Sequence, residues 1–238
     1  MPHPSAIATP GPKPLPNSEP TQLALALAHS ESLAREDFLV GPSNAAALSL
    51  IECWPDWPSR IMLLRGPEGA GKSHLAAIWA RMSGARMLTS RALKRADVPM
   101  ALATGALVLE NIAEGAFDEA ALFHLLNFAR EDRAYLLIIA RNSPAAWQLA
   151  LPDLASRLRA IPVAALEAPD AVLFRAVLIK LFADRQLTIE ESLVSFLTNR
   201  IERSFAAARD AVSRLYREAL RLQRPVTRAL AAELFRAP

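Results

Sequence analysis

The sequence predicts an α/β fold, with a parallel β-sheet flanked by helices and followed by a small all-helical domain. Helix-forming stretches alternate with strand-like segments, and helical spacing replaces the strands beyond Pro169. The 238 residues, 52% of them hydrophobic, are enough to bury a sizeable core. Five segments are apolar on both faces, as doubly covered parallel strands are: 60–66, 85–90, 105–112, 134–142 and 160–166.

Residues 1–20 form a proline-rich tail. They hold seven prolines and few large apolar side chains, so burial cannot offset the entropy of ordering them. We expect this tail to be disordered.

The stretch 21–37 begins with TQLALALAH and has two interpretations. Its alternation, with leucines on one face, suits a first strand. Alanine is a poor strand former, however, and no turn residues connect the stretch to a partner strand. The alternative is an extended peptide that binds another protein.

The strongest motif, GPEGAGKS at 66–73, lies between a predicted strand and the helical stretch 71–82, as a phosphate-binding loop does. The glycines let backbone N–H groups turn inward, and the helix N-terminus adds partial positive charge. Lys72 is expected to reach the β- and γ-phosphates of a nucleotide, and Ser73 to bind Mg²⁺. The candidate residues here are Gly66, Pro67, Glu68, Gly69, Ala70, Gly71, Lys72, Ser73 and His74.

The strand 105–112 ends in LENI, where a nucleotide hydrolase of this kind needs acids. Glu110 can hold a metal-bound water, and we predict it as the second Mg²⁺ ligand beside Ser73. Asn111 cannot accept a proton, so intrinsic hydrolysis is expected to be slow. The strand 134–142 ends in Arg141 and Asn142, and either of them can contact the nucleotide.

The C-terminal region 169–238 is predicted to form helices at 170–183, 190–199, 204–223 and 227–236. In the third, residues four and three apart form one apolar stripe: Ala208, Val212, Leu215, Ala219 and Leu222. From Arg200 onward the sequence contains nine arginines and four acidic residues. This excess of positive charge indicates either a solvated helical face or a surface for DNA.

The composition argues against intrachain disulfides, a metal site built from cysteine and histidine, and a membrane-spanning segment. Cys53 is the only cysteine, so no intrachain disulfide forms, and the four histidines have no metal-ligand spacing. No apolar run approaches the ~20 residues that span a bilayer, and we expect a cytoplasmic protein. A net charge of +3 permits contact with nucleic acid.

Three segments together resemble the AAA+ module of the bacterial replication initiator DnaA, and most of all its short Hda-type relatives: FLVGPSN at 38–44, the phosphate loop, and LPDLASRL at 151–158. The resemblance spans residues 22–238 and implies an AAA+ base at 38–168 and a helical lid at 169–238. It leaves no room for the initiator's C-terminal DNA-reading domain, which points to a regulator.

The resemblance also implies roles for particular residues. An adenine pocket is implied for Phe38, Val40, Gly41, Pro42 and Asn44.

Arg157 matches an arginine finger that reaches a nucleotide on a neighbouring protomer; a surface role at a helix end is the alternative. Arg203 matches a lid residue that senses the γ-phosphate. Near the N-terminus, a short peptide of Gln22, Leu23, Leu25 and Leu27 matches one that docks on the DNA sliding clamp.

The function that the resemblance implies is regulatory inactivation of DnaA. Bound to ADP or ATP with Mg²⁺, the protein would dock on the DNA-loaded clamp, the β subunit of DNA polymerase III. There it would stimulate hydrolysis of DnaA-bound ATP and so prevent over-initiation of replication. DNA would be contacted mainly through the clamp, and a homo-oligomer is compatible with this picture.

Two other functions fit part of the sequence. A DNA-binding loader or initiation accessory would use the basic lid helices. A small-molecule P-loop kinase gives no role to FLVGPSN or LPDLASRL.

Overall fold

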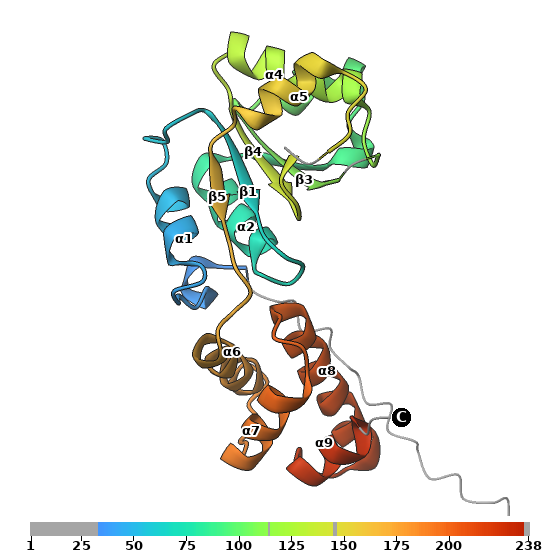
Figure 1. Cartoon of the computed structure of the whole chain (residues 1–238). Helices are drawn as coiled ribbons and strands as arrows, with labels where there is room; N and C mark the ends of the chain where they lie inside the picture. The colour runs from blue at the N-terminus through green and yellow to red at the C-terminus, as the bar shows by residue number, and fades with distance from the viewer. Residues whose placement is uncertain (1–32, 114, 145–146, 236–238) are drawn as a thin grey trace, which may run out of the picture.

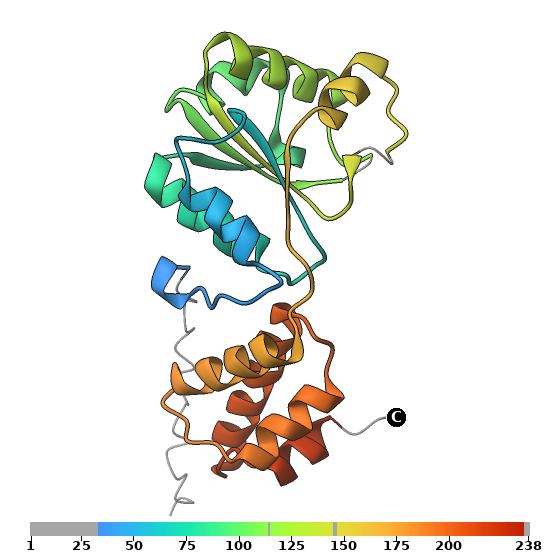
Figure 2. The ribbon, with the colours of Figure 1, turned by 60° about the vertical axis from the view of Figure 1, so that its left-hand side comes forward.

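The computed structural model describes residues 33–113, 115–144 and 147–235. Figures 1 and 2 show two bodies end to end. We call residues 33–165, which hold the sheet, the base, and residues 171–235, which are helical, the lid. The strands therefore give way to helices between Ala165 and Ala171.

The sheet has five parallel strands in the order β2-β3-β4-β1-β5. All five predicted strands are confirmed. The last is shorter than predicted because Pro162 has no N–H to donate, although its carbonyl still accepts from Leu63 N at 3.0 Å. The bounds are β1 Ile61–Arg65, β2 Arg86–Thr89, β3 Ala106–Ile112, β4 Tyr135–Ala140 and β5 Val163–Ala165.

The three central strands β3, β4 and β1 are covered on both faces, as their apolar side chains require, whereas the edge strands β2 and β5 are mostly exposed and depart from the predicted double coverage. In β1, Ile61 and Leu63 face one core, while Met62 and Leu64 face the other. Helices α3 (Val98–Ala101), α4 (Glu119–Glu131) and α5 (Pro152–Arg159) supply the first core, and α1 (Ala45–Glu52) and α2 (Lys72–Ser83) supply the second.

Helices α1, α3 and α5 were not predicted as helices. Each is eight residues or fewer, too short for apolar periodicity to be distinctive. The described part of the base also contains the 3₁₀ turns η1 Arg35–Asp37, η2 Ser90–Ala92 and η3 Arg95–Asp97.

The lid consists of α6 (Ala171–Ala183), α7 (Glu191–Arg200), α8 (Phe205–Leu222) and α9 (Arg228–Leu234), close to the four predicted helices. Side chains of Asp170, Ser204 and Thr227 cap the N-termini of α6, α8 and α9. The stripe predicted on the third helix is confirmed: Ala208, Val212, Leu215 and Ala219 are buried, and Leu222 packs against them.

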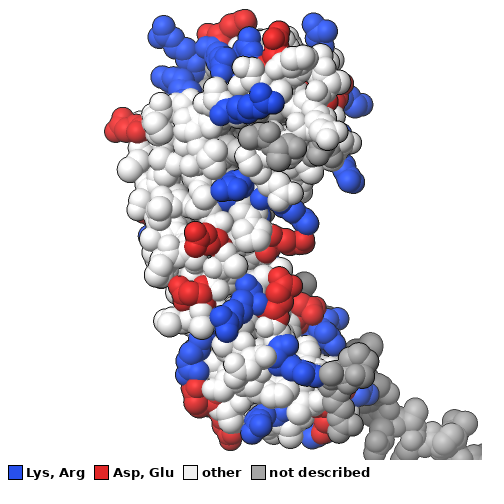
Figure 3. Space-filling view, viewed as in Figure 1, with Lys and Arg blue, Asp and Glu red and all other residues white. Residues whose placement is uncertain are grey.

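Charged side chains are distributed unevenly. Figure 3 shows many lysines and arginines, with a few acids among them, at the end of the base away from the lid, and charges of both signs over the lid. Several lid arginines are paired: Arg214 with Asp210, Arg221 with Glu218 and Arg224 with Glu233. Within the described ranges, no helix has both the length and the apolar character needed to cross a membrane.

Candidate functional site

The loop 66–71 connects β1 to α2 and needs its glycines. A Cβ on Gly66 would lie 2.7 Å from the carbonyl oxygen of Leu166, directly after β5. Gly69 and Gly71 have φ of +70° and +96°, in the left-handed region that favours glycine. The backbone can therefore curl tightly around the start of the helix.

Helix α2 begins without a side-chain cap, because its N-cap residue is Gly71. Its first N–H groups, with their partial positive charge, are thus left for an anion. The Lys72 ammonium donates to the carbonyl oxygens of Gly66 at 2.7 Å and Pro67 at 2.6 Å. Burial, and then the charge of Arg141, lowers the pKa of Lys72.

A cavity of about 720 Å³ opens in front of this loop, and we call it the phosphate cavity. Its lining comes from the loop with the start of α2, from the ends of β2, β3 and β4, from η2, and from α8 of the lid. Of the predicted site residues, the structure brings these together: Glu68, Gly69, Gly71, Lys72, Ser73, His74, Asn111 and Arg141. The other three loop residues, Gly66, Pro67 and Ala70, are not among the described lining residues.

The end of β3 bulges. Its register with β4 shifts between Leu109 and Ile112, and Asn111 adopts φ of 57°. The buried Ser90 hydroxyl donates to the Asn111 carbonyl at 2.9 Å and holds this turn. Asn111 is thereby exposed to the phosphate cavity, while Glu110, one residue earlier, remains in the strand opposite Thr89.

The donors predicted for Mg²⁺ are one hydroxyl and one carboxylate, on Ser73 and Glu110. Among the described residues, no group of three or more histidines, cysteines or acids could hold a metal ion. Of these two, Ser73 lines the phosphate cavity, whereas Glu110 is not among its described lining residues, so the structure does not bring the predicted pair of Mg²⁺ ligands together there.

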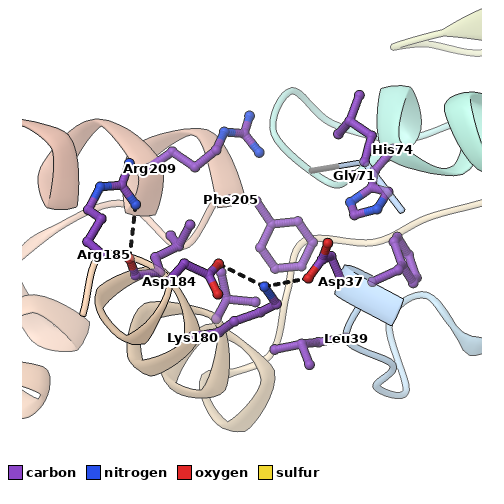
Figure 4. A pocket seen from close by; sticks show the side chains of 13 residues that line it. Asp37, Leu39, Gly71, His74, Lys180, Asp184, Arg185, Phe205 and Arg209 are labelled. Atoms are coloured by element: carbon purple, nitrogen blue, oxygen red, sulfur yellow. Dashed lines mark hydrogen bonds and ion pairs between the residues drawn. The ribbon is translucent and has the colours of Figure 1, made fainter. Parts of the chain in front are cut away.

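A second cavity, of about 290 Å³, lies between base and lid, and we call it the junction cavity. Figure 4 shows Phe205 of the lid near His74 of α2 and near Gly71, the N-cap residue of that helix. Phe38 is buried and meets the His74 ring edge-on, with centroids 5.1 Å apart. Aromatic faces and a half-buried imidazole make this cavity suitable for a flat heterocycle.

Leu39 also lines the junction cavity, whereas residues 40–44 are not among its described lining residues. The buried Asn44 amide accepts from Gly41 N and donates to the Leu39 carbonyl, both at 2.9 Å. A Cβ on Gly41 would meet Leu173 of α6 at 3.0 Å, so this loop packs directly on the lid. Val40 and Pro42 are exposed.

On the lid, Arg209 lines both cavities, and Arg203 lies among the lining residues of neither. Arg203 is exposed, just ahead of the cap residue Ser204. Arg209 is one helical turn beyond Phe205, whose N–H donates to the Gly69 carbonyl at 2.8 Å. The sequence signal that could have indicated Arg209 is this i, i+4 spacing from an aromatic residue at the start of a helix.

Arg157 lies on α5, whose first turn contains Pro152. Its guanidinium carbon is 4.9 Å from the centre of the Phe123 ring of α4, a cation–π contact. Figures 1 and 2 show α4 and α5 at the end of the base remote from the lid. Arg157 is not among the described residues that line either cavity.

At the end of β4, Arg141 and Asn142 are both exposed, but they lie differently. Arg141 lines the phosphate cavity and forms an ion pair with Glu68 at 2.7 Å. Asn142 is not part of the described lining. The candidate clamp peptide, Gln22, Leu23, Leu25 and Leu27, lies outside the described residues.

Comparison with protein families finds no match for this chain, and comparison with curated proteins finds none either. Solved structures do match. Domain III of the replication initiation protein DnaA from Thermotoga maritima aligns at a TM-score of 0.70 and 20% identity, over 87% of this chain and 98% of that one.

Two further structures align at similar levels. AMPPCP-bound DnaA from Aquifex aeolicus gives a TM-score of 0.62 at 15% identity, over 77% of this chain and 64% of that one. A variant of Thermotoga maritima RuvB gives a TM-score of 0.66 at 19% identity, over 83% of this chain and 70% of that one. At these identities the matches establish the AAA+ fold, with its parallel sheet and helical lid.

Proposed function

We propose that this chain binds ADP or ATP with Mg²⁺ across the two cavities. The phosphate loop, with its uncapped helix and the Lys72 ammonium, offers the donors that a polyphosphate requires. The junction cavity, reached by the same residues Gly71 and His74, would take the adenine. The AMPPCP bound to the DnaA of Aquifex aeolicus, a structural neighbour, supports this assignment.

The wider role we propose is that of a DnaA-related regulator that stimulates hydrolysis of DnaA-bound ATP and so limits initiation. The observation that carries it is the position of Arg157. Its guanidinium lies on α5, away from the lining of this chain's own cavities. An arginine so placed is available to a nucleotide on another molecule.

In this role Arg157 neutralises charge on the phosphoryl group that DnaA transfers to water. Fingers of this kind raise hydrolysis by about 10³- to 10⁵-fold. The Phe123 ring beneath the guanidinium restricts its orientation and leaves its N–H donors available.

The remaining partners follow from the N-terminal peptide. Gln22 would hydrogen-bond at the rim of a pocket on the sliding clamp, and Leu23, Leu25 and Leu27 would fill its apolar subsites. A peptide this short binds at about micromolar strength. Loading the clamp on DNA would then bring the regulator to newly replicated DNA, and contact with DNA would be indirect.

The test is a hydrolysis assay with ATP-loaded DnaA, DNA-loaded clamp and the purified protein. The wild type should accelerate release of phosphate, and Arg157→Ala should abolish the acceleration. Arg159→Ala is the matched control, since Arg159 is exposed two residues along the same helix. No acceleration by the wild type, or equal loss in both variants, contradicts the role of Arg157.

A second experiment separates docking from catalysis. Deleting Gln22–Leu27 should abolish binding to the clamp, measured by surface plasmon resonance, and leave nucleotide binding unchanged. Clamp binding that survives the deletion removes the peptide from the proposal.

The alternative, a DNA-binding accessory that acts through the lid, has less support. The ion pairs of Arg214, Arg221 and Arg224 with neighbouring acids reduce the positive charge that the lid presents. Tight DNA binding by the isolated protein that falls steeply with salt would favour this alternative.

A further inference from the structure

The ion pair between Glu68 and Arg141 joins two residues that line the phosphate cavity. Arg141 Nη1 lies 2.7 Å from Glu68 Oε2. Glu68 belongs to the phosphate loop, and Arg141 follows the last residue of β4. The pair therefore joins two elements that border the same cavity.

The sheet places these two residues opposite each other. Strand β4 pairs with β1 up to Ala140 and Arg65, and Gly66 N donates to the Ala140 carbonyl at 3.3 Å. The first residue of the loop is thus fixed beside the residue that precedes Arg141.

The charges around the cavity are unbalanced. Among the described residues that line it, Glu68 is the one carboxylate, and four side chains are cationic: Lys72, Arg91, Arg141 and Arg209. Arg141 is close enough to Lys72 for its charge to lower the pKa of the ammonium. Because Lys72 is the residue that reaches the β- and γ-phosphates in such loops, Arg141 adjoins the same end of a bound nucleotide.

We propose that Glu68 competes with the terminal phosphate of the nucleotide for Arg141, so that the pair discriminates ATP from ADP. With ADP, Arg141 stays on Glu68. With ATP, Arg141 leaves Glu68 and donates to the γ-phosphate. The idea rests on the proposed nucleotide binding and adds to it a mechanism of selection.

The exchange is energetically feasible. The side chains of Arg141 and Glu68 are 62% and 68% exposed, and ion pairs this exposed are weak because water and salt screen them. Hydrogen bonds from a guanidinium to a phosphate bearing more negative charge are stronger. An uncharged residue in place of Glu68 would release Arg141 at no cost and shift the preference toward ATP.

The experiment measures dissociation constants of the full-length protein for ADP and for AMPPCP, each with Mg²⁺. Glu68→Gln should tighten AMPPCP by about fivefold, a typical effect of removing one nearby charge, and change ADP by less than about twofold. Arg141→Ala should weaken AMPPCP by about tenfold, the value of one charge-assisted hydrogen bond, and affect ADP little.

The double variant decides the mechanism, because coupled residues give non-additive effects. In the Arg141→Ala background, Glu68→Gln should no longer tighten AMPPCP. Arg159→Ala, at an exposed arginine outside the described lining of both cavities, is the control and should leave both constants unchanged. Circular dichroism of each variant establishes that it is folded.

Other results overturn the proposal. If Glu68→Gln tightens both nucleotides equally, or still tightens AMPPCP without Arg141, Glu68 acts as a simple repulsive charge. If the wild type binds neither nucleotide, the proposed nucleotide binding itself fails, and the two failures are thereby distinguished.

Discussion

The imidazole of His74 connects helix α2 to the segment that precedes the loop 38–44. Its Nε2 lies 2.8 Å from the Ala34 carbonyl oxygen, and its ring meets Phe38 edge-on. Burial lowers the pKa of His74, and the hydrogen bond to Ala34 only partly opposes this. The fold therefore favours the neutral imidazole at this position.

The charges around His74 act in both directions. Asp37 raises its pKa, whereas Arg209 and Arg81 lower it. Because the net shift is downward, the unfolded chain binds more protons than the folded one between the lowered pKa and the ordinary value of 6.5. Stability from this site rises with pH through that window and is constant above it.

We therefore predict that acidification weakens the fold partly through His74. Lowering the pH from about 7.5 to about 5.5 should reduce the urea midpoint of the wild type more than that of His74→Gln. His124→Gln, on α4, is the control and should behave as the wild type does. Equal acid sensitivity of the wild type and His74→Gln would mean that other groups cause the loss.

At the scale of elements, the phosphate loop and the start of α8 are in direct contact. A Cβ on Gly69 would lie 2.9 Å from Ser204 Cβ and 3.0 Å from Ala206 Cβ. The Gly69 carbonyl accepts from Phe205 N at 2.8 Å. The lid thus rests on the loop at a point where only a hydrogen fits.

Gly69→Ala and Gly84→Ala form a matched pair that measures this contact. Both residues have left-handed φ, +70° and +69°, but a Cβ on Gly84 would meet nothing within 4 Å. Each variant should lose about 1–2 kcal/mol from backbone strain. Gly69→Ala should lose about 1–3 kcal/mol more from overpacking.

Urea denaturation of the two variants measures both losses. Similar losses in the two would show that the lid moves aside easily.

At the scale of the whole molecule, Lys180 of α6 joins the lid to the base. Its ammonium pairs with Asp37 of η1 at 2.8 Å and with Asp184 at 2.7 Å, as Figure 4 shows. Burial lowers the pKa of Lys180, but hydrogen bonds to Asp184 and Asp37 outweigh it and raise the pKa overall. The contact to Asp37 borders the junction cavity.

Asp37→Asn and Asp184→Asn each remove one carboxylate from the same ammonium, and only the first crosses from base to lid. Asp37→Asn should increase amide exchange in residues 35–38 and α6 severalfold, because a partly exposed pair is worth about 0.2–1 kcal/mol. Asp184→Asn should leave residues 35–38 unaffected. If the two variants show the same pattern of amide exchange, the apolar contacts between base and lid are sufficient to hold the two bodies together.

Much of the fold follows from local sequence. All five strands and the four lid helices were predicted, because nearby residues carry the signal: short apolar runs for the strands and helical apolar spacing for the lid helices. The phosphate loop was predicted for a similar reason: its glycines, lysine and serine are contiguous, and its conformation depends on those residues. Short helices such as α1 and α5 have too few turns for a clear period.

The sequence alone therefore determined the strands, the lid helices and the phosphate loop. Only the tertiary structure decided which distant side chains meet: Arg209 at both cavities with Arg203 outside them, Asn44 as a brace for the loop 38–44, and Glu68 against Arg141. Periodicity specifies which face of an element is buried. Sheet register and lid packing, which involve residues far apart in the chain, specify what each exposed charge opposes.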